Sequence, residues 1–258
     1  MKMKKRMLLL LDRPSGERNE MMNYTGQNNS SNALEHNPPH RENQGNLRSP
    51  LAVRLAAFGT AGPIVFLGGA TLLGLIRPGY DMASSAISEL ALGPLGWVQT
   101  ANFYLTGLSF IAFAFGLYLY LGHRSRVARA LPCALLVLSG IGLIISGIFP
   151  TDAPGAPETG TGALHNLAFL VTLFPLILTY PLAALLLRRE PGFRAHALVT
   201  ALMPLVVFGL MFVFVGFGSE AGDPLYGVGG LVQRALIVVA FGWITVTGWR
   251  LLARSTER

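Results

Sequence analysis

Six long apolar segments constrain the fold of this chain more than any other feature. They cover about residues 54–76, 100–121, 131–149, 163–187, 197–217 and 230–252. A helix needs roughly twenty apolar residues to cross the hydrocarbon core of a bilayer, and each segment is long enough. Backbone polar groups find no water in lipid, so each segment must form a helix rather than an open strand. The sequence therefore predicts an all-α, multi-pass membrane protein with six transmembrane helices.

The composition agrees with a surface that faces lipid. Charged residues make up 13% of the chain and hydrophobic residues 52%, whereas soluble domains carry about 25% charged residues. The formal net charge is +7, but no basic stripe interleaved with aromatic residues is present, as binding to single-stranded nucleic acid would require. We therefore expect membrane lipid as a partner and no nucleic acid, and the sequence leaves a homo-oligomer open.

The N-terminal part of the chain differs sharply from the rest. Residues 1–48 are polar, rich in Asn, Glu, Arg and Pro, and lack apolar periodicity. Such a composition predicts a disordered tail, followed by a six-helix transmembrane domain over 49–258. The basic and apolar start, Met1 to Leu11, is too short for the core of a signal peptide. It is either part of the unstructured tail or lies before a true start at Met21 or Met22.

Arginine is distributed unevenly between the two sets of loops, and this predicts the orientation. One set of arginines lies at or before the start of the first segment and at the ends of the second, fourth and sixth. These are Arg48, Arg54, Arg124, Arg126, Arg129, Arg188, Arg189, Arg194, Arg250, Arg254 and Arg258. The positive-inside rule then places both termini in the cytoplasm, with the protein in the cell membrane. Acidic residues show the reverse bias, and the outer loops hold Asp81, Glu89, Asp152, Glu158, Glu220 and Asp223.

Three similar motifs stand at the outer starts of even-numbered apolar segments. They read Gly96-Trp97-Val98-Gln99-Thr100, Gly162-Ala163-Leu164-His165-Asn166 and Gly230-Leu231-Val232-Gln233-Arg234. An offset of 68 positions aligns Gly162 with Gly230, His165 with Gln233, and Phe149 with Phe217. The pattern indicates either a repeated helical hairpin or a chance match between apolar sequences. Because all three motifs lie at one end of the bundle, we expect their polar side chains to gather there.

The first outer loop carries the longest run of small polar residues. From Asp81 onward it predicts a short helix with Asp81 as N-cap, which would place Asp81, Ser84, Ser85 and Ser88 on one face. This helix either lies on the bilayer with its serines solvated, or folds over the bundle and lines a site.

His165 and Arg234 are the most informative single residues. His165 is the histidine at the outer end of the bundle, where it could act as an acid or base or bond headgroups and loop backbone. Arg234 lies inside the sixth segment, where it either snorkels to headgroups or forms an ion pair with Asp81, Glu89 or Asp152. The predicted polar cluster, for ligand binding or for structure, comprises Asp81, Ser84, Ser88, Glu89, Gln99, Asp152, His165 and Arg234. No metal-ligand spacing is present and Cys133 is the one cysteine, so we expect no metal and no cofactor.

These residues also carry a family resemblance. The elements are Asp81-x-x-Ser84-x-x-Ile87-Ser88-Glu89-Leu90, Gly147-Ile148-Phe149-Pro150-x-Asp152, Gly162-x-x-His165 and Gln233-Arg234. Together they resemble the six-helix membrane family called domain of unknown function 998, over about residues 54–252. The family has no established activity, so the resemblance implies the fold and the membrane location only. It also leads us to expect an acidic residue before the arginine, where this chain has Gln233.

Three functions fit these patterns. The favoured one is a non-enzymatic protein that binds or passes a small polar or lipid ligand through an outer-facing polar pocket. The alternative is a membrane-embedded lipid hydrolase with His165 as acid or base and Asp81, Asp152 and Ser88 around it, loosely similar to the alkaline ceramidases. Those enzymes use several histidines around zinc, and the single outer histidine of this chain favours the first function. A structural or partner-binding subunit is the third.

Overall fold

A computed structural model describes residues 49–219 and 222–256, with no side-chain detail for the last two. Within these residues the chain forms six α-helices and one 3-10 helix, and no strand. They are α3 (Pro50–Ile76), η1 (Ile87–Ala91), α4 (Gly96–Tyr120), α5 (Arg126–Ile148), α6 (Gly160–Leu187), α7 (Arg194–Phe217) and α8 (Tyr226–Thr256). All six α-helices are long and apolar enough to cross a membrane. The predicted all-α, six-span fold is confirmed, whereas the predicted tail and its start methionines lie outside the described residues.

Side-chain caps extend the helices beyond their apolar segments. The Ser125 hydroxyl accepts a hydrogen bond from the Ala128 amide over 3.3 Å, so α5 begins at Arg126. The helix therefore begins about five residues before the apolar segment predicted over 131–149, and Pro132 lies in its second turn. A polar cap with a charged first turn carries no hydropathy signal, although it satisfies free amides at the helix start.

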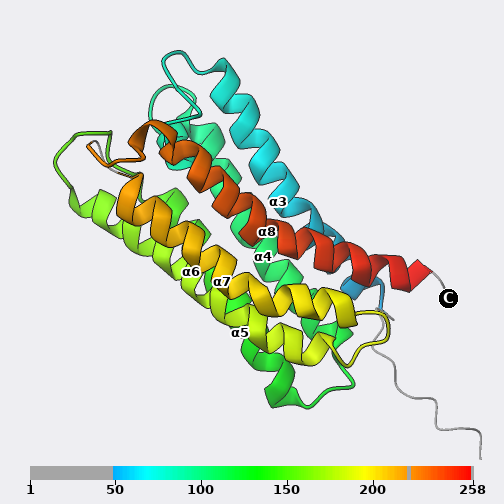
Figure 1. The fold of residues 1–258 in the computed structure, drawn as a ribbon. Coiled ribbons are helices and arrows are strands. Elements are labelled where there is room, and N and C mark those ends of the chain that lie inside the picture. Colours follow the sequence, from blue (N-terminus) through cyan, green and yellow to red (C-terminus); the bar gives the residue numbers. More distant parts are fainter. Residues whose placement is uncertain (1–48, 220–221, 257–258) are drawn as a thin grey trace, which may run out of the picture. The chain divides into compact units, whose positions relative to one another are not determined.

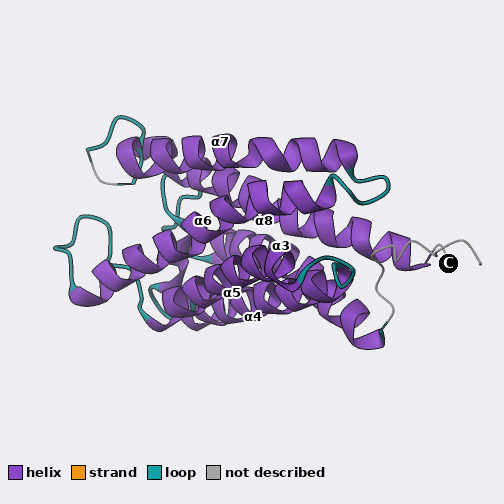
Figure 2. Cartoon of the chain, turned by 90° about the horizontal axis from the view of Figure 1, so that it is seen from below, coloured by secondary structure: helices purple, strands orange, loops and turns teal. Residues whose placement is uncertain are grey.

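Neighbouring helices in the sequence pack side by side, and α3 against α8 closes the ring (Figures 1 and 2). The core between α3, α4 and α8 is aromatic. The ring centroid of Phe66 lies 5.6 Å from those of both Phe103 and Phe241, and Phe110 lies 4.8 Å from Phe241. Gly116 and Gly142 allow the helices to approach closely, because a Cβ at Gly116 would press on α3 and one at Gly142 on α6.

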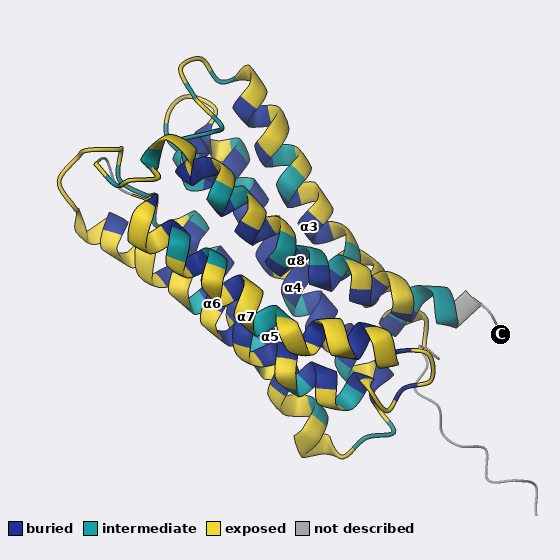
Figure 3. Cartoon of the chain, in the orientation of Figure 1, coloured by how far each residue is buried: buried dark blue, intermediate teal, exposed yellow. Residues whose placement is uncertain are grey.

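Figure 3 shows that the outward faces of the helices are exposed. Many of the exposed residues on these helices are large and apolar. On α7 the exposed fractions of Leu198, Leu202 and Leu205 are 71%, 59% and 74%. A soluble protein rarely exposes an apolar patch of this extent. Lipid is the solvent that such a surface requires, so the bundle is a multi-pass membrane protein.

Candidate functional site

A cavity of about 650 Å³ opens at the end of the bundle that holds the η1, α5–α6 and α7–α8 loops. All six helices contribute to its lining. Its inner part is apolar and contains Phe66, Phe103, Leu143, Leu173, Ile237 and Phe241. Its outer part is polar and contains Ser88, Glu89, Asp152, Glu158, His165 and Gln233. Four of the eight residues of the predicted polar cluster therefore line one cavity: Ser88, Glu89, Asp152 and His165.

Asp152 is held at the start of α6. Its Oδ2 accepts from the Thr159 amide over 2.8 Å, and its Oδ1 accepts from the Thr159 hydroxyl over 2.7 Å. The hydroxyl and amide of Thr159 hold the pKa of this carboxyl below its usual value. Thr159 in turn is the N-cap of α6, accepting from the Gly162 amide over 3.1 Å. A Cβ at Gly162 would overlap the Asp152 carboxylate, so the glycine leaves room for this acidic cap.

His165 lies one turn further along α6 and joins the two ends of the α5–α6 hairpin. Its Nδ1 lies 2.8 Å from the Phe149 carbonyl oxygen and 3.2 Å from that of Ser146. A carbonyl can only accept, so Nδ1 carries a proton and donates. This is the predicted alternative of bonding to loop backbone. Nε2 has no hydrogen-bond partner among the described residues, and the residue lines the cavity, so the remaining ring nitrogen is available to a ligand.

The predicted helix from Asp81 is wrong. The chain forms a turn over residues 81–85 and then η1, separated by the extended backbone of Ala86. Asp81 does cap the turn, accepting from the Ala83 amide over 3.0 Å and from the Ser84 hydroxyl over 2.8 Å. Ser88 belongs to η1 and lines the cavity, so the predicted shared face of Asp81, Ser84 and Ser88 does not exist.

Contacts with α8 explain why this loop is not a continuous helix. The Gly230 amide donates to the Ser84 carbonyl over 3.1 Å, and the Leu231 amide donates to the Ala83 carbonyl over 3.0 Å. The Ile87 amide, which would donate to the Ala83 carbonyl in a continuous helix, donates to Gln233 instead. A Cβ at Gly230 would also overlap the Ser85 carbonyl. The second turn of α8 therefore donates two backbone amides to the loop.

Arg234 holds the same loop by hydrogen bonds, and the prediction that it forms an ion pair is wrong. Within the described residues it contacts no carboxylate at ion-pair distance. Instead Nη1 donates to the carbonyls of Ser85 and Gly230 over 3.0 and 2.9 Å, and Nη2 donates to the Tyr80 hydroxyl over 2.6 Å. The guanidinium is half-buried and bonded to protein, so simple snorkelling does not describe it either. Carbonyl and phenol oxygens meet its need for acceptors without a second charge.

Tyr80 and Gln233 are functional candidates that the sequence reasoning did not select. Tyr80 donates to the Ala86 carbonyl over 2.9 Å and accepts from Arg234, and burial raises its pKa. Gln233 accepts from the Ile87 amide over 2.6 Å and lines the cavity. Gln233 follows Gly230 by three residues, as His165 follows Gly162, and this match could have identified it from the sequence. Tyr80 had none, because its partners are backbone groups and an arginine far away in the sequence.

Gln99 does not join its counterparts at the cavity. It is fully buried, accepts from the Asn102 amide nitrogen over 3.4 Å, and leaves its own Nε2 without a partner among the described residues. Within the described residues no hydrogen bond joins Gln99, His165 and Arg234 to one another, and only His165 of the three lines the cavity. The structure divides the predicted polar cluster into the cavity group, a loop fastening made by Asp81, Ser84 and Arg234, and Gln99 alone.

One family model matches most of the chain. It is described as a protein of unknown function (DUF998), and it matches residues 60–250. The match includes every element that carried the resemblance, from Asp81 to Arg234. No curated protein and no solved structure matches the chain.

Proposed function

We propose that this chain, which belongs to the uncharacterised DUF998 family, binds an amphipathic, lipid-like molecule from the outer side of the cell membrane. The proposal is drawn from the geometry of its cavity. One observation carries the proposal, namely a single cavity whose lining changes from polar at the loops to apolar between the helices. Its volume of about 650 Å³ falls within the range of small-molecule sites, roughly 300–1,000 Å³.

The apolar part suits a hydrocarbon tail. Phe66, Leu173 and Phe241 are almost fully buried by the surrounding helices and line the cavity. A tail that leaves water for such a lining gains roughly 25 cal/mol per Å² of apolar surface. This part of the cavity therefore supplies affinity without selecting a head group.

The polar part favours a head group that donates hydrogen bonds. Glu89, Asp152 and Glu158 contribute acceptors, and no lysine or arginine is among the described residues that line it. The free Nε2 of His165 is also an acceptor in the tautomer set by its carbonyl partners. Hydroxyl and ammonium groups match these acceptors, whereas a phosphate would meet negative charge. We therefore propose a polyol or amine head group.

A second candidate function is hydrolysis of a lipid in the same cavity. It rests on His165, whose Nδ1 is held by backbone carbonyls while its Nε2 is free, as a general base requires. Ser88 and Asp152 line the cavity, but no hydrogen bond joins either to His165 within the described residues. The chain of contacts expected of a nucleophile and its base is thus incomplete, which favours binding over catalysis.

The test is a variant that fills the apolar part of the cavity. Leu143→Trp adds bulk to a lining residue on α5, and Leu138→Trp adds the same bulk to the exposed face of that helix. Native mass spectrometry of gently solubilised protein should show a co-purifying amphiphile in the parent and in Leu138→Trp. Leu143→Trp should retain about tenfold less, equivalent to 1.4 kcal/mol. Equal retention in both variants would contradict the proposal.

The hydrolase alternative needs a separate readout. His165→Gln retains a polar side chain but removes the base, so hydrolysis of a fluorogenic lipid ester would stop while amphiphile retention stayed. Turnover by the parent protein that is lost in His165→Gln would establish the enzyme. Retention without any turnover would support the binding function.

A further inference from the structure

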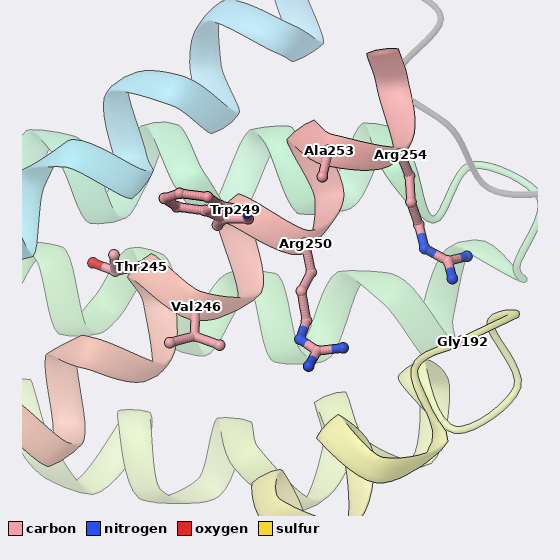
Figure 4. Close-up of a pocket in the computed structure, with 7 residues that line it drawn as sticks. All are labelled: Gly192, Thr245, Val246, Trp249, Arg250, Ala253 and Arg254. Carbon is pink, nitrogen blue, oxygen red and sulfur yellow. The ribbon is translucent and has the colours of Figure 1, made fainter. Parts of the chain in front are cut away.

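A second hollow lies at the opposite end of the bundle, between the last turns of α8 and the α6–α7 loop (Figure 4). It has a volume of about 470 Å³. Its lining consists of Gly192, Thr245, Val246, Trp249, Arg250, Ala253 and Arg254. We call it the basic groove. It shares no lining residue with the outer cavity, so it requires its own explanation.

Among the described residues that line it, the basic groove has two arginines and no acidic residue. Arg250 and Arg254 are one helical turn apart on α8 and therefore lie on the same side of the helix. Figure 4 shows both guanidinium groups extending from α8 toward the loop that carries Gly192. Neither group forms an ion pair or a hydrogen bond with any described residue. Two adjacent cations without a counter-charge attract an anion.

The acidic residue of the same loop cannot supply that counter-charge. Glu190 is buried, and its Oε1 accepts from Arg124 Nη2 over 2.6 Å and lies 2.9 Å from His123 Nε2. Its charge is already balanced by the α4–α5 loop. The positive charge of the basic groove is thus left for a partner outside the described chain.

Arg254 is also held in position before any ligand binds. Its guanidinium carbon lies 5.1 Å from the ring centroid of Phe193, a cation–π distance. Gly192 has φ +70°, and a Cβ there would overlap Arg254 Nη2. The Arg254 guanidinium therefore packs against the backbone of Gly192. A side chain that is already ordered loses less conformational freedom when it binds.

The remaining lining indicates where the anion comes from. Trp249 has an exposed fraction of 69% and Val246 of 49% on the outward surface of α8. Tryptophan is enriched where a membrane helix meets the headgroup layer. The basic groove thus combines an apolar side toward the acyl chains with a cationic side at the helix end. We propose that it binds the phosphate of an anionic phospholipid in the leaflet that surrounds this end of the bundle.

The experiment compares lipid retention by matched variants of the full chain. Protein in mixed micelles receives equal amounts of phosphatidylglycerol and phosphatidylcholine, and native mass spectrometry counts the bound lipids. Arg250→Gln with Arg254→Gln removes both groove cations. Arg126→Gln with Arg188→Gln removes the same charge from exposed positions outside the groove. The groove variant should lose its preference for phosphatidylglycerol about tenfold, and the control variant should keep it.

Further variants keep the proposal testable if the double variant folds poorly. Arg250→Gln alone removes a side chain with no described partner, and it should still lower the preference. Gly192→Ala keeps both charges but displaces Arg254, so it should also lower the preference. Equal preference in the groove and control variants would overturn the proposal. Displacement of the lipid by low-millimolar inorganic phosphate would assign the groove to a soluble anion and overturn the lipid source.

Discussion

The contact between Arg234 and Tyr80 leads to the sharpest stability prediction. Arg234→Leu removes a 2.6 Å hydrogen bond to the Tyr80 hydroxyl and two bonds to the carbonyls of Ser85 and Gly230. A hydrogen bond to a charged group contributes about 1.5–3 kcal/mol, and the lower end applies to a half-buried group. The Tyr80 hydroxyl also lies 3.2 Å from the Ser85 carbonyl oxygen, so without Arg234 it can turn its single proton from Ala86 to Ser85. We therefore expect a total loss of about 2–4 kcal/mol in the free energy of unfolding.

A double-mutant cycle isolates the pair. Tyr80→Phe removes the hydroxyl and keeps the ring, so the cycle with Arg234→Leu should give a coupling of about 1.5 kcal/mol. Arg77→Leu is the matched control, because the Arg77 guanidinium also lies 5.7 Å from the Tyr80 ring centroid but donates to the Glu89 carbonyl rather than to the hydroxyl. Its cycle with Tyr80→Phe should show no measurable coupling.

The assay is denaturant titration of purified protein in mixed micelles, with unfolding followed by tryptophan fluorescence. A cycle of Arg234→Leu with Asp81→Asn separates this mechanism from a salt bridge, because Asp81 is exposed and bonded to its own turn. The reasoning is refuted if Arg234 couples to Asp81 and not to Tyr80. That result would restore the carboxylate partner expected from the sequence.

Three further predictions concern the α5–α6 loop and the orientation. Gly162→Ala displaces the Asp152 carboxylate and should lower the melting temperature, whereas Gly160→Ala, with open space around its Cβ, should leave it unchanged or raise it. The pKa of Asp152 is lowered in the folded state. Its contribution to stability is therefore complete above its usual pKa of 3.8 and is lost as the pH falls through the lower folded value. Asp152→Asn should remove this part of the acid-induced melting. A cysteine at Glu158 in a cysteine-free background should react with an impermeant maleimide in intact cells, and labelling at Ser125 instead would reverse the orientation.

Hydropathy was sufficient to predict the helices but not the residues at which they begin and end. A bilayer offers the backbone no hydrogen-bond partners, so any segment apolar enough to enter it must become a helix. This rule uses only local composition, which the sequence displays. The ends depend on caps such as Ser125 and Thr159, and the start of α5 was therefore misplaced by about one turn.

The polar residues at the cavity end of the bundle were visible in the sequence, but their partners were not. Asp152 and His165 stood out because charge and imidazole are rare beside apolar segments. Their contacts are with a threonine and with the carbonyls of Phe149 and Ser146. Every residue has a carbonyl, so no pattern of residue types predicts which one a side chain will bond.

By itself the sequence determined that this protein has six membrane-spanning helices, with acidic residues, serine and histidine near one end. Tertiary structure alone decided that Ser88, Glu89, Asp152 and His165 share a cavity while Arg234 fastens a loop. The Ile87 amide bonds Gln233 across 146 positions of sequence, and such contacts exist only once α3 packs against α8. Long-range packing brings together groups whose spacing along the chain carries no signal, so the site could be assembled only in three dimensions.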